Sequence, residues 1–170
     1  MSSLVRCVAA TLIVLLVSEQ FAFALGSKNA AYFGGTITVF GTPKDPVEGQ
    51  LDTANEAALV FRPRDKSFAD KNLSIPYAKV IDLEYGQKAG RRVGAAVGTT
   101  VLLGPIGLLS LFSKKRKHFL TVGFKDDADK DQVAVIELGK DIVRTTLAIV
   151  QTRSGKEIEY QDDEARKSAK

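Results

Sequence analysis

Few side chains in this sequence are of a type that could carry out acid, base or nucleophilic chemistry. His118 is the only histidine, and it adjoins a lysine, so an ordinary strand residue is a better interpretation than a general base. Ser110 and Ser113 lie near Lys114 and Lys115, but a serine–lysine dyad depends on geometry that adjacency in sequence does not provide. From the sequence, we therefore expect that the protein has no catalytic residue and is not an enzyme.

Residues that could bind a metal or a cofactor are equally few. Four closely spaced aspartates suggest calcium at first, namely Asp126, Asp127, Asp129 and Asp131. However, Lys130 lies among them, and the loop glycine and bidentate glutamate of an EF-hand are missing. The only cysteine is Cys7, near the N-terminus, and the glycines follow neither the phosphate-loop nor the dinucleotide spacing. We therefore expect no metal and no cofactor.

The positive charge of the chain is concentrated around one apolar segment. Net charge is +4, and eight of the 24 Lys and Arg residues fall between Tyr85 and Lys125, where there is no Asp or Glu. Within that region, residues 93–113 (VGAAVGTTVLLGPIGLLSLFS) carry no charge. As one straight helix they would extend about 31 Å, enough to cross a membrane. Pro105 in the middle predicts a bend instead.

The glycine spacing and the basic flanks predict how this insert, residues 90–117, meets a membrane. Gly90, Gly94 and Gly98 recur every four residues and form a helix-packing face, so we expect a hydrophobic helical hairpin. Arms of about ten residues are too short to span a bilayer but can enter one leaflet. The expected contacts with anionic lipid are Lys88, Arg91, Arg92, Val97, Leu102, Leu103, Ile106, Leu108, Leu109, Leu111, Phe112, Lys114, Lys115, Arg116 and Lys117.

The N-terminal residues 1–24 have the order of a secretory signal peptide. A start containing one arginine precedes the apolar run 8–17, and the sequence Ala-Phe-Ala ending at Ala24 fits a signal peptidase. We predict cleavage after Ala24 and export to the periplasm or the cell-envelope membrane. An uncleaved anchor stays open, and with 93–113 as a second crossing it would make a two-pass membrane protein.

The elements that would position the insert are short and β-rich. Turn residues separate runs that predict strands at 32–40, 49–53, 57–61, 73–77, 80–85, 118–124, 132–138 and 156–160. Pro76 belongs on an edge or at a bend, because it cannot donate a ladder hydrogen bond. Helical spacing over 140–153, followed by Gly155, predicts one amphipathic helix. We expect a linker at 25–30 and a disordered charged tail at 161–170.

Over roughly residues 31–154, this succession of elements resembles the bacterial pleckstrin-homology-like (PH-like) and GRAM-like domains. The resemblance lies in EGQLDTANEAALVF (48–61), LSIPYAKVIDLEYG (73–86) and the hairpin plus helix at 119–153. It implies an α+β fold: a PH-like β-barrel or sandwich of about seven short antiparallel strands with a C-terminal helix, spanning residues 31–160. A generic α+β domain and a lipocalin-like barrel remain alternatives.

Together these features predict an exported binding or scaffolding module that associates with membrane lipids and holds a protein partner or a second copy of itself. We expect no nucleic acid partner, because only Phe112 and Phe119 lie among the basic residues and an exported chain rarely meets nucleic acid. If 81–85 and 119–124 share one sheet, the insert must enter and leave the membrane on one side. Two alternatives stay open: an insert packed within its own domain or an oligomer interface, and a glycine-zipper protein that assembles into an oligomer or pore.

Overall fold

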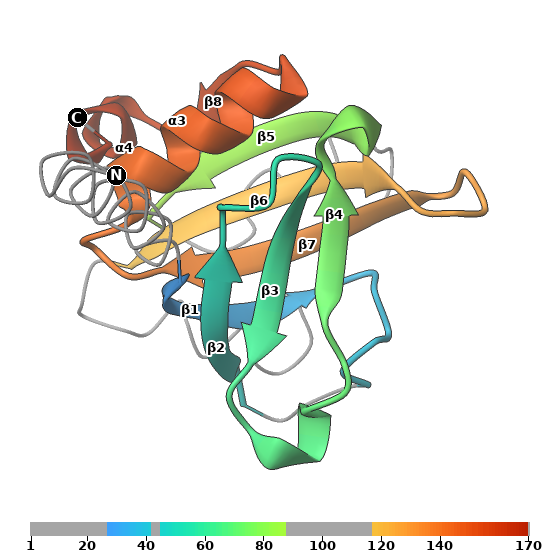
Figure 1. Ribbon diagram of the computed structural model, residues 1–170. Helices are drawn as coiled ribbons and strands as arrows, with labels where there is room; N and C mark the ends of the chain where they lie inside the picture. Colours follow the sequence, from blue (N-terminus) through green and yellow to red (C-terminus); the bar gives the residue numbers. More distant parts are fainter. Residues whose placement is uncertain (1–26, 42–44, 88–116, 170) are drawn as a thin grey trace, which may run out of the picture.

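Eight strands form one continuous sheet in the part of the chain that the computed structural model describes, residues 27–41, 45–87 and 117–169. They are β1 (Ser27–Gly35), β2 (Val47–Asp52), β3 (Ala58–Pro63), β4 (Leu73–Pro76), β5 (Val80–Gly86), β6 (His118–Lys125), β7 (Asp131–Leu138) and β8 (Ile158–Tyr160). Their order across the sheet is β4-β3-β2-β1-β7-β6-β5-β8, with β8 parallel to β5 and the other neighbours antiparallel. The sheet curls into a half-barrel (Figure 1).

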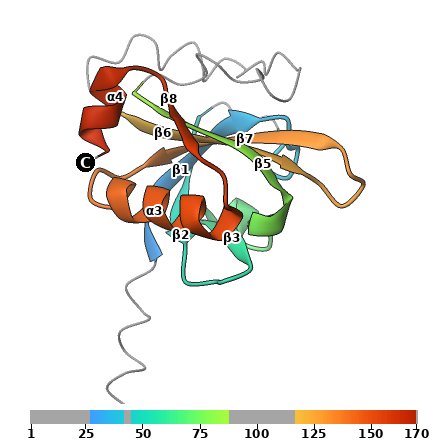
Figure 2. The ribbon, with the colours of Figure 1, turned by 90° about the horizontal axis from the view of Figure 1, so that it is seen from above.

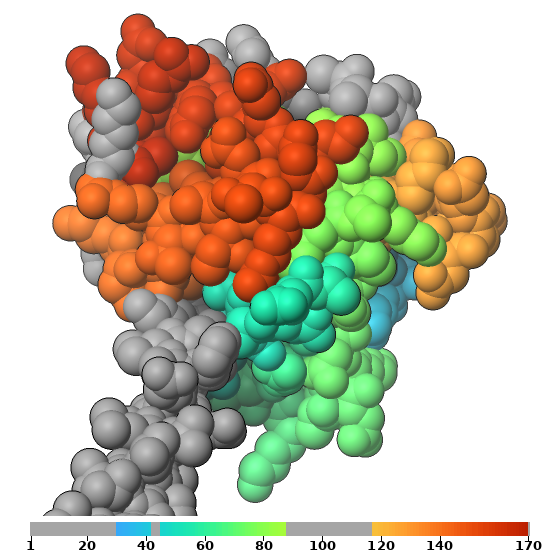
Figure 3. Space-filling view, turned by 45° about the horizontal axis from the view of Figure 1, so that its top comes forward, coloured from blue at the N-terminus to red at the C-terminus, as the bar shows by residue number. Residues whose placement is uncertain are grey.

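The concave side of this sheet holds the main core. Residues along β2 alternate between the core and the solvent: Val47 and Leu51 are buried, whereas Glu48 and Gln50 are exposed. Helix α3 (Val143–Ser154) contributes Val143, Thr146, Leu147 and Val150 as its buried residues. Figure 3 shows α3 across one face of the molecule, beside the connection from β4 to β5. The predicted sheet-rich α+β class, with a helix after the last hairpin, is therefore confirmed.

Two local features end and anchor α3. Gly155 has φ 67° and donates its backbone N–H to the carbonyl of Gln151, so it forms the left-handed C-cap that the sequence predicts. Arg153 Nη1 donates to the carbonyls of Thr53 and Asn55 at 2.6 and 2.7 Å. The end of the helix is thereby tied to the turn between β2 and β3.

Short 3-10 turns make two of the corners. The turn η2 (Lys66–Phe68) lies between β3 and β4, and Asp65 accepts the backbone N–H of Ser67 at its start. The turn η3 (Tyr77–Lys79) separates β4 from β5 directly after Pro76. Because β4 lies at an edge of the sheet, the predicted edge position of Pro76 is confirmed.

The first strand differs from the predicted range 32–40. β1 begins at Ser27, inside the expected linker, and ends at Gly35 after a bulge between Tyr32 and Gly34. Gly35 has φ 149°, and a Cβ there would collide with the carbonyl oxygen of Val133. A residue with a side chain could not take this position without displacing β7.

The C-terminus is the second correction. Instead of a disordered tail over 161–170, residues Asp163–Ser168 form helix α4. The carboxylate of Asp162 caps it by accepting the N–H of Ala165 at 2.7 Å, and the Ala165 side chain is fully buried in the core. Composition was misleading because one small alanine is enough to dock the helix.

The predicted signal peptide, residues 1–24, and all of the predicted insert except Lys117 lie outside the described residues. No described helix has the length and apolarity needed to cross a membrane.

Candidate functional site

The two strands that flank the insert are neighbours in the sheet. β5 ends at Gly86, whose register partner on β6 is Phe119, and the two strands are antiparallel neighbours. The chain therefore leaves the sheet after Gln87 and returns at Lys117 at the same end of one strand pair. This is the arrangement that a one-sided insert requires.

Lys117 is the single predicted lipid contact within the described part of the chain. Its Nζ donates to Glu137 Oε2 at 2.9 Å and lies 4.9 Å from the ring centroid of Phe33. Since both charged side chains are about one-quarter to one-third exposed, this is a partly buried ion pair. The other predicted contacts and the three helix-packing glycines fall in residues 88–116, outside the described residues.

The convex side of β1, β7, β6 and β5 carries a second set of buried side chains, which we call the outer face. It comprises Phe33, Phe119, Thr121, Val133 and Val135, with exposed fractions of 4, 2, 7, 1 and 0%. The rings of Phe33 and Phe119 meet edge to face with centroids 4.9 Å apart. These residues alternate along their strands with members of the main core, such as Leu120 and Ile136. Figure 2 shows α3 on one side of β5, β6 and β7, and the outer face is the other side of these strands.

Acidic residues border the outer face on β5 and β8. Glu84 is buried and lies in register between Thr121 of β6 and Glu159 of β8. Burial, and then the charge of Glu159, raise the pKa of Asp82 above its usual range, and its Oδ1 is buried without a hydrogen-bond partner.

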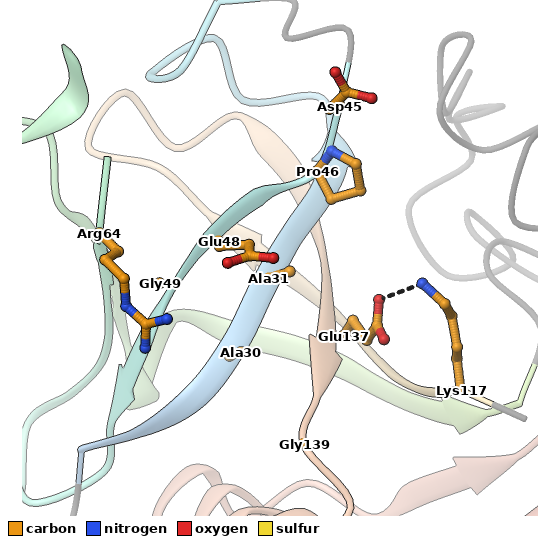
Figure 4. Close-up of a pocket in the computed structure, with 10 residues that line it drawn as sticks. All are labelled: Ala30, Ala31, Asp45, Pro46, Glu48, Gly49, Arg64, Lys117, Glu137 and Gly139. Carbon is orange, nitrogen blue, oxygen red and sulfur yellow. Dashed lines mark hydrogen bonds and ion pairs between the residues drawn. The ribbon is translucent and has the colours of Figure 1, made fainter. Parts of the chain in front are cut away.

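A shallow groove of about 470 Å³ runs over β2, β1 and β7 near Lys117 (Figure 4). Its charged lining residues have both signs: Asp45, Glu48, Arg64, Lys117 and Glu137. Figure 4 shows Lys117 turned toward Glu137 on one side, with Arg64 on the other. Because acids and bases alternate around it, the groove matches neither a simple anion nor a simple cation.

His118 is engaged in a structural contact. Its Nδ1 lies 2.6 Å from the phenol oxygen of Tyr85, which is also 3.1 Å from Ser168 Oγ on α4. Burial and the nearby Lys140 lower the pKa of His118, with Glu137 acting in the opposite direction. His118 Nδ1 and the Tyr85 hydroxyl form this short hydrogen bond, and together with Ser168 they link α4 to the sheet.

In the loop between β6 and β7, the Asp126 carboxylate accepts hydrogen bonds from nearby residues of the same hairpin. Asp126 accepts the backbone N–H groups of Ala128 and Lys130 and the side-chain amide of Gln132, and these hydrogen bonds lower its pKa. Among the described residues, no cluster of three or more His, Cys, Asp or Glu side chains has the arrangement of a metal site.

Sequence reasoning missed the outer face and the contacts of Tyr85 with His118 and Ser168. The signal for the first was present, because β6 and β7 (HFLTVGFK and DQVAVIEL) carry apolar residues at successive positions and not only at alternate ones.

No family model, curated protein or solved structure matches this chain.

Proposed function

We propose that this protein is an exported, membrane-associated binding or scaffolding module with a PH-like sheet domain, in which the insert supplies the contact with lipid. The observation that carries the proposal is the pairing of Gly86 with Phe119, which brings both ends of the insert to one place. A sheet domain that carries such a loop lies entirely on one side of the membrane.

The pairing also weighs against the two-pass alternative. A single crossing by residues 93–113 would leave β5 and β6 on opposite sides of the bilayer, where no ladder could join them. A loop that returns to the same side keeps the ladder intact. Its uncharged stretch of 21 residues gives two arms of about ten each, which suits burial in one leaflet.

The charges around the insert favour an anionic surface. Outside Lys117, which pairs with Glu137, six basic residues flank the apolar stretch: Lys88, Arg91, Arg92, Lys114, Lys115 and Arg116. Each cation near an anionic headgroup contributes about 1 kcal/mol before salt screening. An apolar wedge and a polybasic flank together provide the two signals that stable membrane attachment needs.

The curled sheet and the helix that follows its last hairpin support a PH-like arrangement, and the sheet domain would carry the partner. A partner of such a module is a protein or a second copy of this chain. We propose no reaction, because the one histidine is committed to the Tyr85 contact.

Flotation with liposomes tests this function. The chain is mixed with vesicles containing or lacking anionic lipid, beside a variant in which residues 88–116 are replaced by a short Gly/Ser linker. We expect the intact chain to float with anionic vesicles and the folded linker variant to stay at the bottom. An intact chain that remains at the bottom with both vesicle types would refute the membrane function. Leakage of a trapped dye on binding would instead favour the pore-forming glycine zipper.

A further inference from the structure

We propose that the free edge of β4 and the groove beside it bind an extended peptide segment of another protein, which adds to the sheet as a further strand. This inference deepens the binding part of the proposed function, and it rests on that function only in assigning the partner to the sheet domain. The peptide chemistry that fits is two apolar side chains at alternate positions with a cationic side chain nearby.

The first argument is the hydrogen bonding of β4. Among the described strands β4 pairs with β3 alone, and Figure 1 shows it at the edge of the sheet. The N–H of Tyr77 donates to the carbonyl of Ala57 at 2.9 Å. Because hydrogen-bonded and non-hydrogen-bonded pairs alternate along an antiparallel ladder, Ile75 bonds to β3, whereas the N–H and C=O of Ser74 point away from it. Ser74 is exposed, so both groups are open to a partner strand.

The length of this edge favours a short peptide over a second folded copy. β4 has four residues, and Pro76 has no N–H to donate at the next position that faces outward. Short edges that contain proline resist pairing between whole sheets. One residue of a peptide can nevertheless exchange two backbone hydrogen bonds with Ser74.

The second argument is a groove of about 490 Å³ beside this edge. Ile37 and Val39, which follow β1, line it together with Phe124 of β6. Phe124 belongs to the main core, and the other two side chains are partly buried against that core. A peptide residue opposite Ser74 would share its exposed side of the sheet, so the residues before and after it would turn their side chains toward the groove. Two apolar side chains at alternate positions therefore match this surface.

The third argument is charge. The charged residues that line the groove are Lys125, Asp126 and Asp127. Lys125 Nζ is paired with Asp131 at 2.7 Å. The side chain of Asp127 is fully exposed, and among the described residues only Lys79 pairs with it, through Oδ1. A carboxylate in this position favours a lysine or arginine on the peptide.

Selection from a displayed library of short random peptides, with the unmodified chain as bait, tests the inference. We expect the enriched peptides to share an apolar–any–apolar pattern next to a cationic residue, and to bind Ser74→Pro about tenfold more weakly or worse. Proline at this position removes the outward N–H and no bond to β3, so the sheet should stay folded. Ser74→Ala keeps the N–H and, as the matched control, should bind like the unmodified chain. Absence of enriched peptides, or equal binding to Ser74→Pro, would overturn the inference.

Amide hydrogen exchange is a second measurement, and it needs no variant. An enriched peptide should slow exchange at the Ser74 amide about tenfold or more, because that amide gains an acceptor. The amides of Leu73 and Ile75 already bond to β3, so they serve as internal controls and should change little. Unchanged exchange at Ser74 with the peptide bound would place the peptide elsewhere and overturn the inference.

Sedimentation distinguishes a second copy from a peptide partner. A dimer that forms without peptide and is dissociated by Ser74→Pro would show that a second copy occupies the edge, and would overturn the inference. The result is also separable from flotation, because peptide binding is measured without lipid. Failure to float, with a peptide bound at Ser74, leaves the edge site standing and removes the membrane function, whereas flotation without any enriched peptide does the reverse.

Discussion

The backbone of Gly86 on β5 lies opposite that of Phe119 on β6, so the chain enters and leaves the insert at neighbouring points. The last described residue before the insert, Gln87, and the first one after it, Lys117, therefore adjoin the same end of one strand pair. Under the proposed function, the basic residues of both flanks would then contact the same anionic surface.

Neutralising one flank should weaken membrane binding. The variant combines Lys114→Gln, Lys115→Gln and Arg116→Gln, and the loss of three cations predicts an affinity for anionic vesicles about 100-fold lower at low salt. The difference should shrink as salt rises, because surface charges are screened. Vesicle co-sedimentation across a salt series measures it. The matched control neutralises three exposed lysines elsewhere, Lys66, Lys130 and Lys156, and should bind almost as the unmodified chain does. Equal losses in both variants would show that net charge, not the flank, matters.

Removing the Tyr85 hydroxyl should loosen the C-terminal helix. Tyr85→Phe deletes the contacts with His118 Nδ1 and Ser168 Oγ, and we expect a loss of about 1–2 kcal/mol in the free energy of unfolding. Hydrogen exchange should speed up most in α4, because Ser168 belongs to that helix. Tyr160→Phe, on the neighbouring strand, is the control. Unchanged exchange in α4 of the Tyr85→Phe variant would contradict a fastening role.

The burial of His118 and the nearby Lys140 predict a pH dependence of stability. The folded state lowers the pKa of His118 below its usual value of 6.5, so the unfolded chain binds a proton first as the solution is acidified. The contribution of neutral His118 is therefore complete above pH 6.5 and is lost as the pH falls through that value toward the lower folded pKa. Denaturant unfolding between pH 5 and 8 measures this slope. His118→Gln should remove that part of the slope, and an identical slope in the variant would contradict the assignment.

Asp82 should respond to pH in the opposite direction. Its folded pKa is raised, chiefly by burial, so its charge destabilises the fold above that pKa and the penalty disappears as acid protonates it. Asp82→Asn should therefore stabilise the protein at pH 7, by less than about 1 kcal/mol because water still screens the carboxylate. The gain should vanish below the unfolded value near pH 4. Thermal melts at both pH values check it, with the exposed Asp141→Asn as control. A gain of equal size at low pH would refute the electrostatic cause.

Most of the secondary structure could be predicted because its signals are local. Pro76 at an edge and Gly155 at a helix end follow from the missing donor of one residue and the missing Cβ of the other. The condition on which the one-sided insert depends, that 81–85 and 119–124 share one sheet, is also met, since those segments belong to β5 and β6. The tail was mispredicted because a single buried Ala165 leaves almost no trace in composition.

By itself, the sequence determined where strands and the main helix form, and it concentrated charge and apolar character in one insert. It did so because hydrophobic period, proline, glycine and charge act over a few neighbouring residues. Only the tertiary structure decided that β8 runs parallel to β5, that Tyr85 meets both His118 and Ser168, and that the outer face is buried. Those relationships join residues that are distant in the chain, and they exist only once the sheet has curled and chosen its strand order.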